Sequence, residues 1–542
     1  MGNHGKLWWQ SGIVYQIYPR SFQDSNQDGV GDLKGIISRL DYLNDGTKDS
    51  LGIDAIWLSP IYPSPMTDFG YDISDYKDID SLFGSKHDFQ ELLAKAHQRG
   101  IKIILDLVIN HTSDQHPWFL ESRSSKENPK RDWYIWHPGK KGKAPNNWFS
   151  AFELQSAWWW DEKTQEFYLG TFTRQQPELN WRNPKLKEAM MDVIRYWLDM
   201  GVDGYRMDVV NWYIKDDQFR SNPWHIQWTP PDLQRHIYDR NRPETHEVCK
   251  EIRSVVNQYQ DRMLVGEIYM ENLESVEEVA KYYGNQDELH LAFNFAFLHQ
   301  KWNAACFHKQ IQRWEKSIPQ GCWPNYTLSN HDQARHYSRY AKKGESHSRA
   351  KVAAALLLTL RGTPFLYYGE EIGMENAKIS RDDLRDPLGV KAWPFLPGRD
   401  GARTPMQWDN TQYGGFSSSK PWLPVGNHDF SKTVQAQKDS PDSLLSFYRN
   451  LIWLRKSTPA LHSGKYEPLI HSPKHCLAYR RFTQEQQICV VLNFSNQKQT
   501  IRLDFSDSPC QILFGTHRSP GEKMPTNIME ILPYEVLLLA KG

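Results

Sequence analysis

Eight short apolar runs recur along the chain and dominate its hydrophobic pattern. They are nearly continuous rather than alternating, which is typical of strands buried on both faces of a parallel sheet. Between several of them lie segments with apolar positions at helical spacing that end on glycine, at 86–100, 183–201 and 346–362. The runs lie at 12–19, 53–60, 101–109, 202–210, 262–269, 291–297, 326–330 and 363–369. Strand and helix alternating in this way predict an α/β fold, a (β/α)₈ TIM barrel.

Two regions depart from this pattern. The stretch after the third run is rich in Trp, Gly, Pro and Asn, and it leaves the carboxyl end of a barrel strand, where barrel active sites lie. We expect an irregular inserted domain there. Beyond residue 462, short strands separated by turn residues predict a C-terminal antiparallel β-sandwich domain. The predicted domains are the barrel at 1–111 and 175–461, the inserted domain at 112–174 and the C-terminal domain at 462–542.

Composition narrows the function classes. The 542 residues include 65 Lys and Arg and 65 Asp and Glu, so the zero net charge argues against nucleic-acid or membrane-surface binding. No run reaches the ~18 apolar residues of a membrane span, and the first residues lack the apolar core of a signal peptide. The six cysteines are scattered, which disfavours a disulfide framework or a zinc site. We expect a cytoplasmic protein.

Polar residues stand where four of the predicted strands end. A charge in an apolar strand is costly unless it is paired or functional, and a single one is often part of a structural salt bridge. Acids at several strand ends would instead converge on one pocket of the barrel. The group comprises Asp106, Asn110, His111, Arg206, Asp208, Glu267, Asn330, His331, Asp332 and Arg335.

Carboxylates, an arginine and histidines in one pocket suit glycoside hydrolysis. One carboxylate attacks the anomeric carbon and a protonated one gives its proton to the leaving oxygen, about 5–5.5 Å apart in retaining enzymes. The acid needs a pKa raised by burial or by negative neighbours. An arginine beside the nucleophile has the opposite effect and keeps that carboxylate ionised.

These stretches, in this order, resemble the α-amylase family of glycoside hydrolases (family 13). More narrowly, they are similar to its oligosaccharide-acting α-glucosidases, such as oligo-1,6-glucosidase and maltase. The resemblance runs from "YQIYPRSFQDSNQDGVGDLKGI" through "RDGARTPMQWD" to the β-rich C-terminus. It implies retention of the α configuration, with Asp208 as nucleophile and Glu267 as general acid/base. Asp332 would be the third carboxylate, which binds sugar hydroxyls and helps to distort the ring.

The resemblance also implies a set of residues that bind substrate. Asp68 would hold the non-reducing glucose, Tyr71 would stack on it, and Arg403 would pair with Asp68. That pair would close the pocket and make the enzyme exo-acting. The other implied residues are Arg206, which would orient Asp208 with Asp106 as a second partner, His111 and His331 on the sugar, and the pocket pair Phe172 and Gln176.

The stretch "DSNQDGVGD" at 24–32 is similar to the start of a calcium-binding EF-hand loop. Position 12 of such a loop is Gly35 here instead of Glu, which argues against a calcium sensor. The resembling family often carries a metal in this loop. An all-oxygen set favours Ca²⁺, with Mg²⁺ as the alternative, in a static site remote from the chemistry; a purely polar turn is the other interpretation. The ligands would be Asp24, Asn26, Asp28, the Val30 carbonyl and Asp32.

Two features point to different linkages. In the resembling enzymes, valine at the position of Val209 tends to accompany α-1,6 cleavage, whereas the segment 381–408 is similar to that of enzymes preferring short α-1,4 substrates. We therefore expect an α-glucosidase of maltooligosaccharides with transglucosylation as a side activity. The alternatives are an oligo-1,6-glucosidase, a sucrose isomerase or a trehalose synthase. A non-catalytic, transporter-associated relative is disfavoured because the three acids are present. We expect no organic cofactor, an oligosaccharide as the only partner, and a monomer or homodimer.

Overall fold

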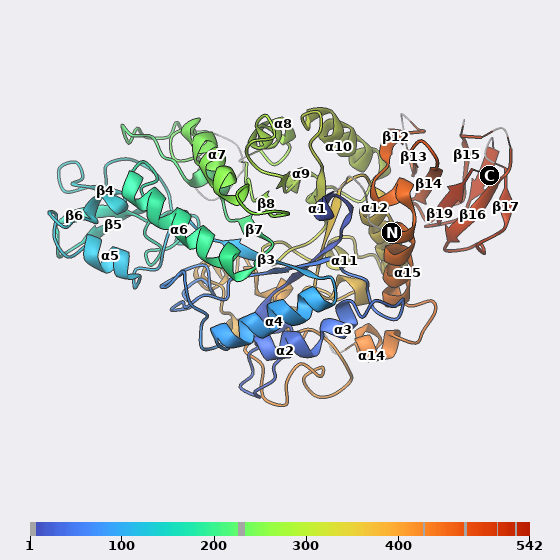
Figure 1. Ribbon diagram of the computed structural model, residues 1–542, viewed down its shortest axis with the longest axis horizontal. Coiled ribbons are helices and arrows are strands. Elements are labelled where there is room, and N and C mark those ends of the chain that lie inside the picture. The colour runs from blue at the N-terminus through green and yellow to red at the C-terminus, as the bar shows by residue number, and fades with distance from the viewer. Residues whose placement is uncertain are drawn as a thin grey trace.

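The computed structural model describes residues 7–225, 233–270, 272–426, 429–470, 474–503, 505–506, 508–525 and 528–541. An eight-stranded parallel sheet lies at its centre (Figure 1). Each of the eight apolar runs contains or overlaps one strand, and the predicted barrel is confirmed. The strand order is β10-β11-β1-β2-β3-β7-β8-β9. The strands are β1 (Val14–Ile17), β2 (Ala55–Leu58), β3 (Lys102–Leu107), β7 (Gly204–Met207), β8 (Met263–Gly266), β9 (Leu291–Ala292), β10 (Asn325–Thr327) and β11 (Thr363–Tyr367).

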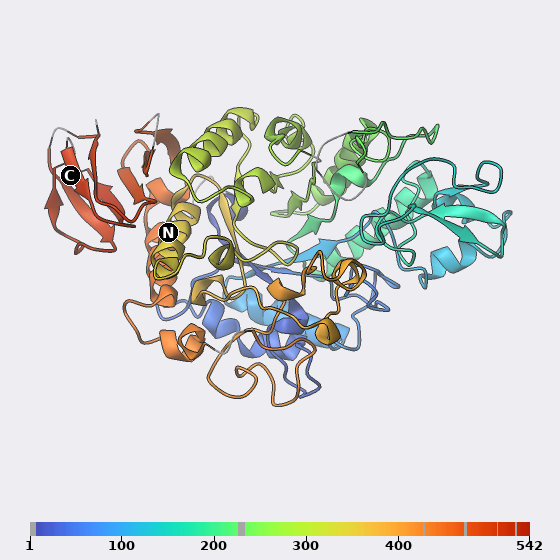
Figure 2. The same ribbon diagram turned by 180° about the vertical axis from the view of Figure 1, so that it is seen from behind.

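Helices cover the outside of this sheet, as the two opposite views show (Figures 1 and 2). The longest of them, α6, shows how the sequence sets its ends. The Asn183 side chain accepts hydrogen bonds from the first backbone N–H groups, Pro184 occupies the first turn, and Gly201 ends the helix at a φ of 108°. The main covering helices are α2 (Leu33–Ser38), α4 (Lys86–Gln98), α6 (Pro184–Met200), α7 (Glu244–Val256), α10 (Ala304–Ser317), α12 (Ser346–Thr359) and α15 (Leu444–Ser457).

The inserted region forms a small unit at one end of the molecule (Figure 1). It contains α5 (Pro117–Ser122) and the antiparallel strands β4 (Trp136–His137), β6 (Glu166–Leu169) and β5 (Trp158–Asp161). Trp158 stacks on Trp148, with ring centroids 5.9 Å apart, in its core. Trp148 Nε1 also donates to the carbonyl of Arg220 at 3.0 Å. The inserted unit is thereby fastened to the segment that follows β7.

The C-terminal part forms two antiparallel sheets, as expected. One sheet has the order β12-β13-β14-β19-β16-β17 and the other pairs β15 with β18. Buried side chains such as Val491, Leu503, Met529 and Leu537 form one cluster between them. The strands are β12 (Lys465–Pro468), β13 (Cys476–Phe482), β14 (Gln487–Asn493), β15 (Gln499–Arg502), β16 (Cys510–Gly515), β17 (Lys523–Met524), β18 (Ile528–Ile531) and β19 (Val536–Ala540).

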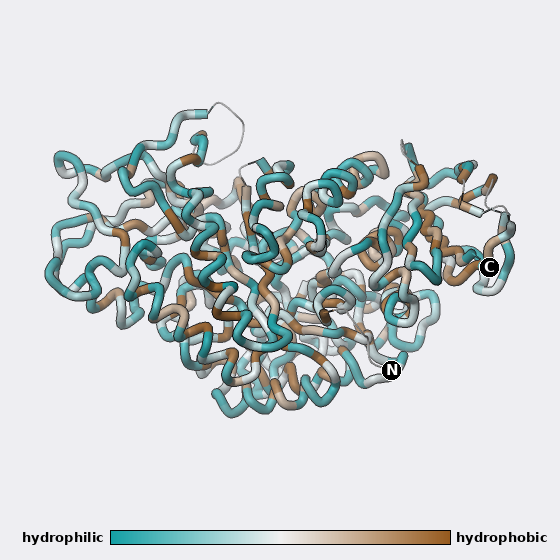
Figure 3. The backbone as a smooth tube through the Cα atoms, turned by 45° about the horizontal axis from the view of Figure 1, so that its top comes forward, coloured by the Kyte–Doolittle hydropathy of each residue, from teal (hydrophilic) through white to brown (hydrophobic). Residues whose placement is uncertain are grey.

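Polar residues prevail on the peripheral loops, whereas apolar residues gather along the strands and the inward turns of the helices (Figure 3). Within the described ranges, no helix combines the length and the apolar character needed to cross a bilayer.

Candidate active site

Strand register gathers the predicted acids around one arginine. Asp106 on β3 lies directly opposite Arg206 on β7, and β7 and β8 then end together, so that Asp208 and Glu267 follow adjacent strand ends. Arg206 donates to Asp106 and to Asp208 at 2.7 Å each. It also donates to Glu267 Oε2 at 2.5 Å. The predicted contacts of Arg206 with Asp106 and Asp208 are therefore present.

The three carboxyl groups share one cation in a buried space. Burial raises the pKa of Asp208 and of Glu267, and Arg206 only partly offsets this effect. Burial also raises the pKa of Asp106. One guanidinium cannot fully balance three carboxylates, so the cluster retains a proton above the usual carboxyl range. A carboxyl pair of this kind supplies both an ionised and a protonated member.

The residue after Asp208 has an unusual backbone. Val209 adopts φ 36° and ψ 50°, in the left-handed region that a β-branched residue rarely enters. This conformation directs its N–H toward Glu267 Oε2, 3.3 Å away. Its side chain packs with Phe172 and Trp212. Val209 thus contacts Glu267 through its backbone and the apolar wall of the cavity through its side chain.

Tyr71 and His331 form a hydrogen-bonded chain behind the acids. His331 Nδ1 accepts from Gln16 Nε2 at 2.8 Å, so the proton of this buried, neutral ring lies on Nε2. Nε2 donates to Tyr71 Oη at 2.6 Å, and Tyr71 Oη donates to Asp106 at 3.0 Å. The Tyr71 and His331 rings are stacked at 5.2 Å. The chain fixes the Tyr71 ring against the cavity.

His111 is held on the other side of Tyr71. Its Nε2 donates to the carbonyl of Tyr71 at 2.9 Å, and burial lowers the pKa of His111 to about 3. The ring is therefore neutral at ordinary pH and offers no charge to a ligand. Gln176 Nε2 lies 3.1 Å from Asp68 Oδ2 and donates to it. These contacts fix one oxygen of Asp68.

The arginine that pairs with Asp68 is Arg399, and the expectation of an Asp68–Arg403 pair was wrong. Arg399 NH2 donates to Asp68 Oδ1 at 2.7 Å and its NH1 donates to Asp332 at 3.1 Å. Arg403, four residues later, turns instead to the carbonyl of His331 at 2.8 Å and to Asp332 at 3.0 Å. Arg399 is oriented toward Asp68 because Asp386 accepts hydrogen bonds from its Nε and NH2.

Asp332 differs electrostatically from the other acids. Burial alone would raise its pKa, but the His331 ring, whose Nε2 lies 3.1 Å from Asp332 Oδ2, opposes this. Arg399 and Arg403 oppose it further and hold the pKa of Asp332 well below its ordinary value. Asp332 is therefore ionised wherever the protein is folded at moderate pH, and it acts as a fixed negative charge.

A cavity of about 480 Å³ opens on these groups. A space of this size is typical of a small-molecule site. Predicted residues that line it are Asp68, Tyr71, His111, Phe172, Asp208, Glu267 and Asp332. Other predicted residues are fully buried and support the wall: Gln176, Arg206, His331 and Arg403.

Several lining residues were not predicted from the sequence. They include apolar groups near the mouth, two of which, Leu388 and Leu396, come from the segment that carries Arg399. The only available signal was the position of that segment next to the "RTPM" motif. The missed lining residues are Phe149, Ala151, Phe152, Leu154, Trp212, Gln234, His236, Arg240, Tyr269, Leu273, Gln333, Leu388, Leu396 and Arg399.

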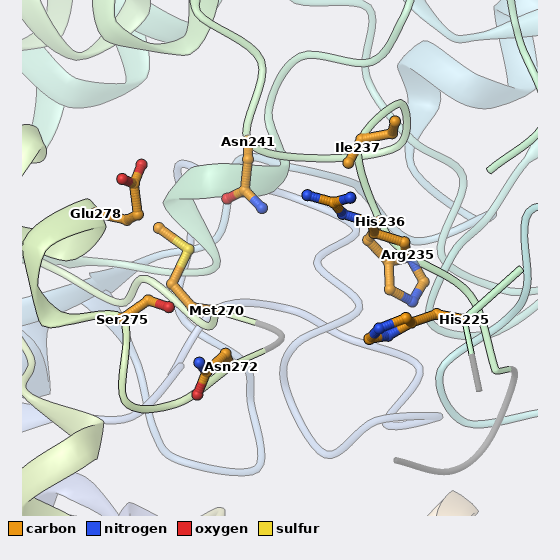
Figure 4. A pocket seen from close by; sticks show the side chains of 9 residues that line it. All are labelled: His225, Arg235, His236, Ile237, Asn241, Met270, Asn272, Ser275 and Glu278. Carbon is orange, nitrogen blue, oxygen red and sulfur yellow. The ribbon is translucent and has the colours of Figure 1, made fainter. Parts of the chain in front are cut away.

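A second cavity of about 440 Å³ adjoins the first, since His236 lines both. Figure 4 shows two groups of side chains facing each other across it, one around His225 and Arg235 and the other around Met270 and Glu278. Its full lining is His225, Arg235, His236, Ile237, Asn241, Met270, Asn272, Ser275 and Glu278.

The 24–32 loop uses its carboxylates within the protein. Asp24 accepts from the backbone N–H groups of Asn26, Gln27 and Gly29, and also from Ser417 Oγ at 2.6 Å. Asp32 caps α2 by accepting from the backbone N–H of Gly35 at 2.7 Å.

The donor chemistry of this loop is all oxygen, as a hard cation requires. Nevertheless, no three or more His, Cys, Asp and Glu side chains are gathered as a metal site in the described parts of the chain.

Replacing Glu267 by a neutral residue should stabilise the fold. Because the pKa of Glu267 is raised in the folded state, its ionisation costs folding free energy as pH rises through that pKa. We expect Glu267→Gln to raise Tm at pH 7 to 8, and the gain to vanish below about pH 4, where the unfolded-state carboxyl is protonated too. The exposed control Glu247→Gln should leave Tm unchanged. A lower Tm for Glu267→Gln throughout would contradict the assignment.

Comparisons with known proteins agree with this geometry. The family model described as "Alpha amylase, catalytic domain" matches residues 16–464. A "Probable alpha-glucosidase" of Rhizobium meliloti is 41% identical, covering 92% of this chain and 91% of its own. An "Oligo-1,6-glucosidase" of Parageobacillus thermoglucosidasius is 40% identical and covers 92% of each chain.

Solved structures give the same result. The α-glucosyl transfer enzyme XgtA superposes with a TM-score of 0.92 at 37% identity, covering 99% of this chain and 100% of its own. The trehalulose synthase MutB of Pseudomonas mesoacidophila gives 0.90 at 35% identity, with the same coverage. The sequence motifs, the barrel with its cluster of acids and these matches lead to one conclusion: the chain belongs to the α-amylase family of glycoside hydrolases.

Proposed function

We propose that the protein is a retaining, exo-acting α-glucosidase that releases α-glucose from the non-reducing ends of short maltooligosaccharides. The observation that carries this proposal is the single arginine, Arg206, that holds Asp208 and Glu267 side by side against one cavity. Because both carboxyl groups accept from the same guanidinium, they lie close together, and a retaining mechanism needs carboxyl groups about 5–5.5 Å apart.

In this mechanism Asp208 attacks the anomeric carbon and forms a covalent glucosyl-enzyme. Glu267 gives its proton to the leaving oxygen and then takes a proton from water, which attacks the anomeric carbon in the second step. The mechanism needs the negative charge on Asp208 and the proton of the cluster on Glu267, and Arg206, which donates to both carboxyl groups, stabilises that charge. Attack by a sugar instead of water would give transglucosylation.

The exo-acting character follows from the far side of the cavity. Asp68, held by Arg399 and Gln176, faces the space where the terminal glucose would lie. A carboxylate that accepts hydrogen bonds from the non-reducing hydroxyls leaves no room for a further sugar. Tyr71 gives the ring a flat apolar surface, and the fixed charge of Asp332 binds its hydroxyls.

A second candidate is α-1,6 cleavage, because valine at the position of Val209 tends to accompany it in the resembling enzymes, and Val209 lines the cavity beside Asp208 and Glu267. Relatives named oligo-1,6-glucosidase are as similar as those named alpha-glucosidase. A sucrose isomerase or a trehalose synthase would use the same acids, and MutB is a close structural neighbour. The α-1,6 enzyme would differ in the linkage that it cleaves, whereas an isomerase or synthase would transfer the glucosyl group to a sugar instead of water.

Initial rates on maltose, isomaltose, sucrose and trehalose, with products separated by chromatography, test the proposal. We expect glucose mainly from maltose, and a kcat about 10²–10⁴-fold lower for Glu267→Gln. Val209→Thr should move the maltose-to-isomaltose ratio further toward maltose. Glucose mainly from isomaltose would support the α-1,6 alternative, and isomerised disaccharide would support the isomerase. If the pure protein turned over none of these substrates, the proposed glycosidase activity would be refuted.

We also propose that the loop binds Ca²⁺, with Mg²⁺ as the alternative, through Asp24, Asn26, Asp28, the Val30 carbonyl and Asp32. The oxygen-only donor set supports this, and the ion would stiffen the loop without entering the reaction.

Asp24→Ala should lower stability by about 1–3 kcal/mol even in EDTA, because it leaves backbone donors unsatisfied. Added Ca²⁺ should raise the Tm of the wild type but not of this variant. The control Asp45→Ala, in another exposed loop, should keep the response. An equal Ca²⁺ response in wild type and Asp24→Ala, or none in either, would show that the loop holds no metal.

A further inference from the structure

Asp386 is a buried acid that does not line the cavity, and its carboxylate accepts hydrogen bonds from Arg399. Its side chain is fully buried, and its Oδ1 accepts from Arg399 Nε at 2.9 Å and from Arg399 NH2 at 2.6 Å. Its Oδ2 accepts from the backbone N–H of Arg399 at 2.9 Å. One carboxylate therefore fixes both the backbone and the guanidinium of the same arginine.

The backbone of Asp386 is fixed in turn. Asp400 Oδ2 accepts from the N–H of Asp386 at 2.8 Å and from the N–H of Arg385 at 2.6 Å. The segment from 386 to 399, which contains the short helix α13 (Pro387–Ala392), is thus closed at its base by Asp386 and Asp400. Leu388 and Leu396, within this segment, line the cavity.

The opposite edge of Arg399 reaches the substrate cavity. Its NH2 also donates to Asp68 and its NH1 donates to Asp332, while Phe152 lies 4.5 Å from the guanidinium carbon. A guanidinium is planar and rigid, so fixing the Nε edge fixes the direction of the remaining N–H groups. Arg399 lines the cavity, whereas the buried Asp386 lies behind it.

We propose that Asp386 is a positioning residue that acts through Arg399 to set the grip of Asp68 and Asp332 on the terminal glucose. The inference rests on the proposed function, since it names how the glucose site of that function is assembled. Without Asp386, the flexible arginine side chain would be held only by the two carboxylates that must also serve the substrate. Loss of Asp386 would then weaken glucose binding more than it slows the chemical step.

A double-mutant cycle separates this role from simple stabilisation of the loop. Glucose dissociation constants from calorimetry, with KM and kcat on p-nitrophenyl α-glucoside, are compared for wild type, Asp386→Asn, Arg399→Met and the double variant. We expect Asp386→Asn to weaken glucose binding by about 10–100-fold and to raise KM more than it lowers kcat. The double variant should bind glucose no more weakly than Arg399→Met alone.

Additive losses in the double variant, or an unchanged glucose affinity in Asp386→Asn, would overturn the inference. The matched control is Asp203→Asn, a buried acid paired with Lys102 where β7 begins, at the opposite end of the barrel. It should lower Tm without changing glucose affinity. A protein that hydrolyses p-nitrophenyl α-glucoside but gives additive losses would refute only the role of Asp386. A wild type that neither binds glucose nor turns over substrate would refute the proposed function as well.

If Asp386→Asn does not fold, a charge-preserving pair carries the test. Arg399→Lys shortens the cation and Asp386→Glu lengthens the acid, so their combination brings the two charges back together. Glucose affinity in the combined variant above that of Arg399→Lys alone would support the inference, and no recovery would overturn it.

Discussion

The guanidinium of Arg206 is bonded to three carboxylates from three adjacent strands, and the reactive end of the barrel is arranged around it. Burying one cation with three acids is costly unless every hydrogen bond is made and one acid keeps a proton. Because three carboxyl groups share one cation, the site can hold an ionised and a protonated carboxyl group side by side. Asp106 is covered from behind by Trp57 and Tyr71, so the two acids that face the cavity are Asp208 and Glu267.

A second ionic centre assembles the glucose site from loops instead of strands. Arg399 and Arg403 lie four residues apart, and both contact Asp332, which keeps that acid ionised beside a pair that holds a proton. Of these two arginines, Arg399 also donates a hydrogen bond to Asp68. Strand register brings Asp208 and Glu267 together, whereas Asp386 places Arg399 against Asp68, where we propose that the terminal sugar binds.

The sequence was sufficient to predict the barrel and the gathering of Asp106, Asp208 and Glu267 in one place, because nearly continuous apolar runs that end in charged residues are typical of buried parallel strands leading into a site. It could not assign Asp68 its partner. Arg399 and Arg403 belong to one motif, and no periodicity tells which side chain an irregular loop turns inward. The attachment of the inserted unit through Trp148 and Arg220 was missed for the same reason, since a contact between two loops leaves no pattern in either. The backbone strain at Val209 was also invisible, because a valine gives no sign of a positive φ.

The most direct test is to trap the glucosyl-enzyme with a fluorinated glucosyl fluoride and to locate the adduct by peptide mass spectrometry. Asp208 accepts a hydrogen bond from Arg206 and also lines the cavity. We therefore predict one added glucosyl group on the peptide that contains Asp208. An adduct on the peptide containing Glu267 or Asp332 would contradict the assignment of the nucleophile. So would rapid turnover with no covalent adduct on any peptide.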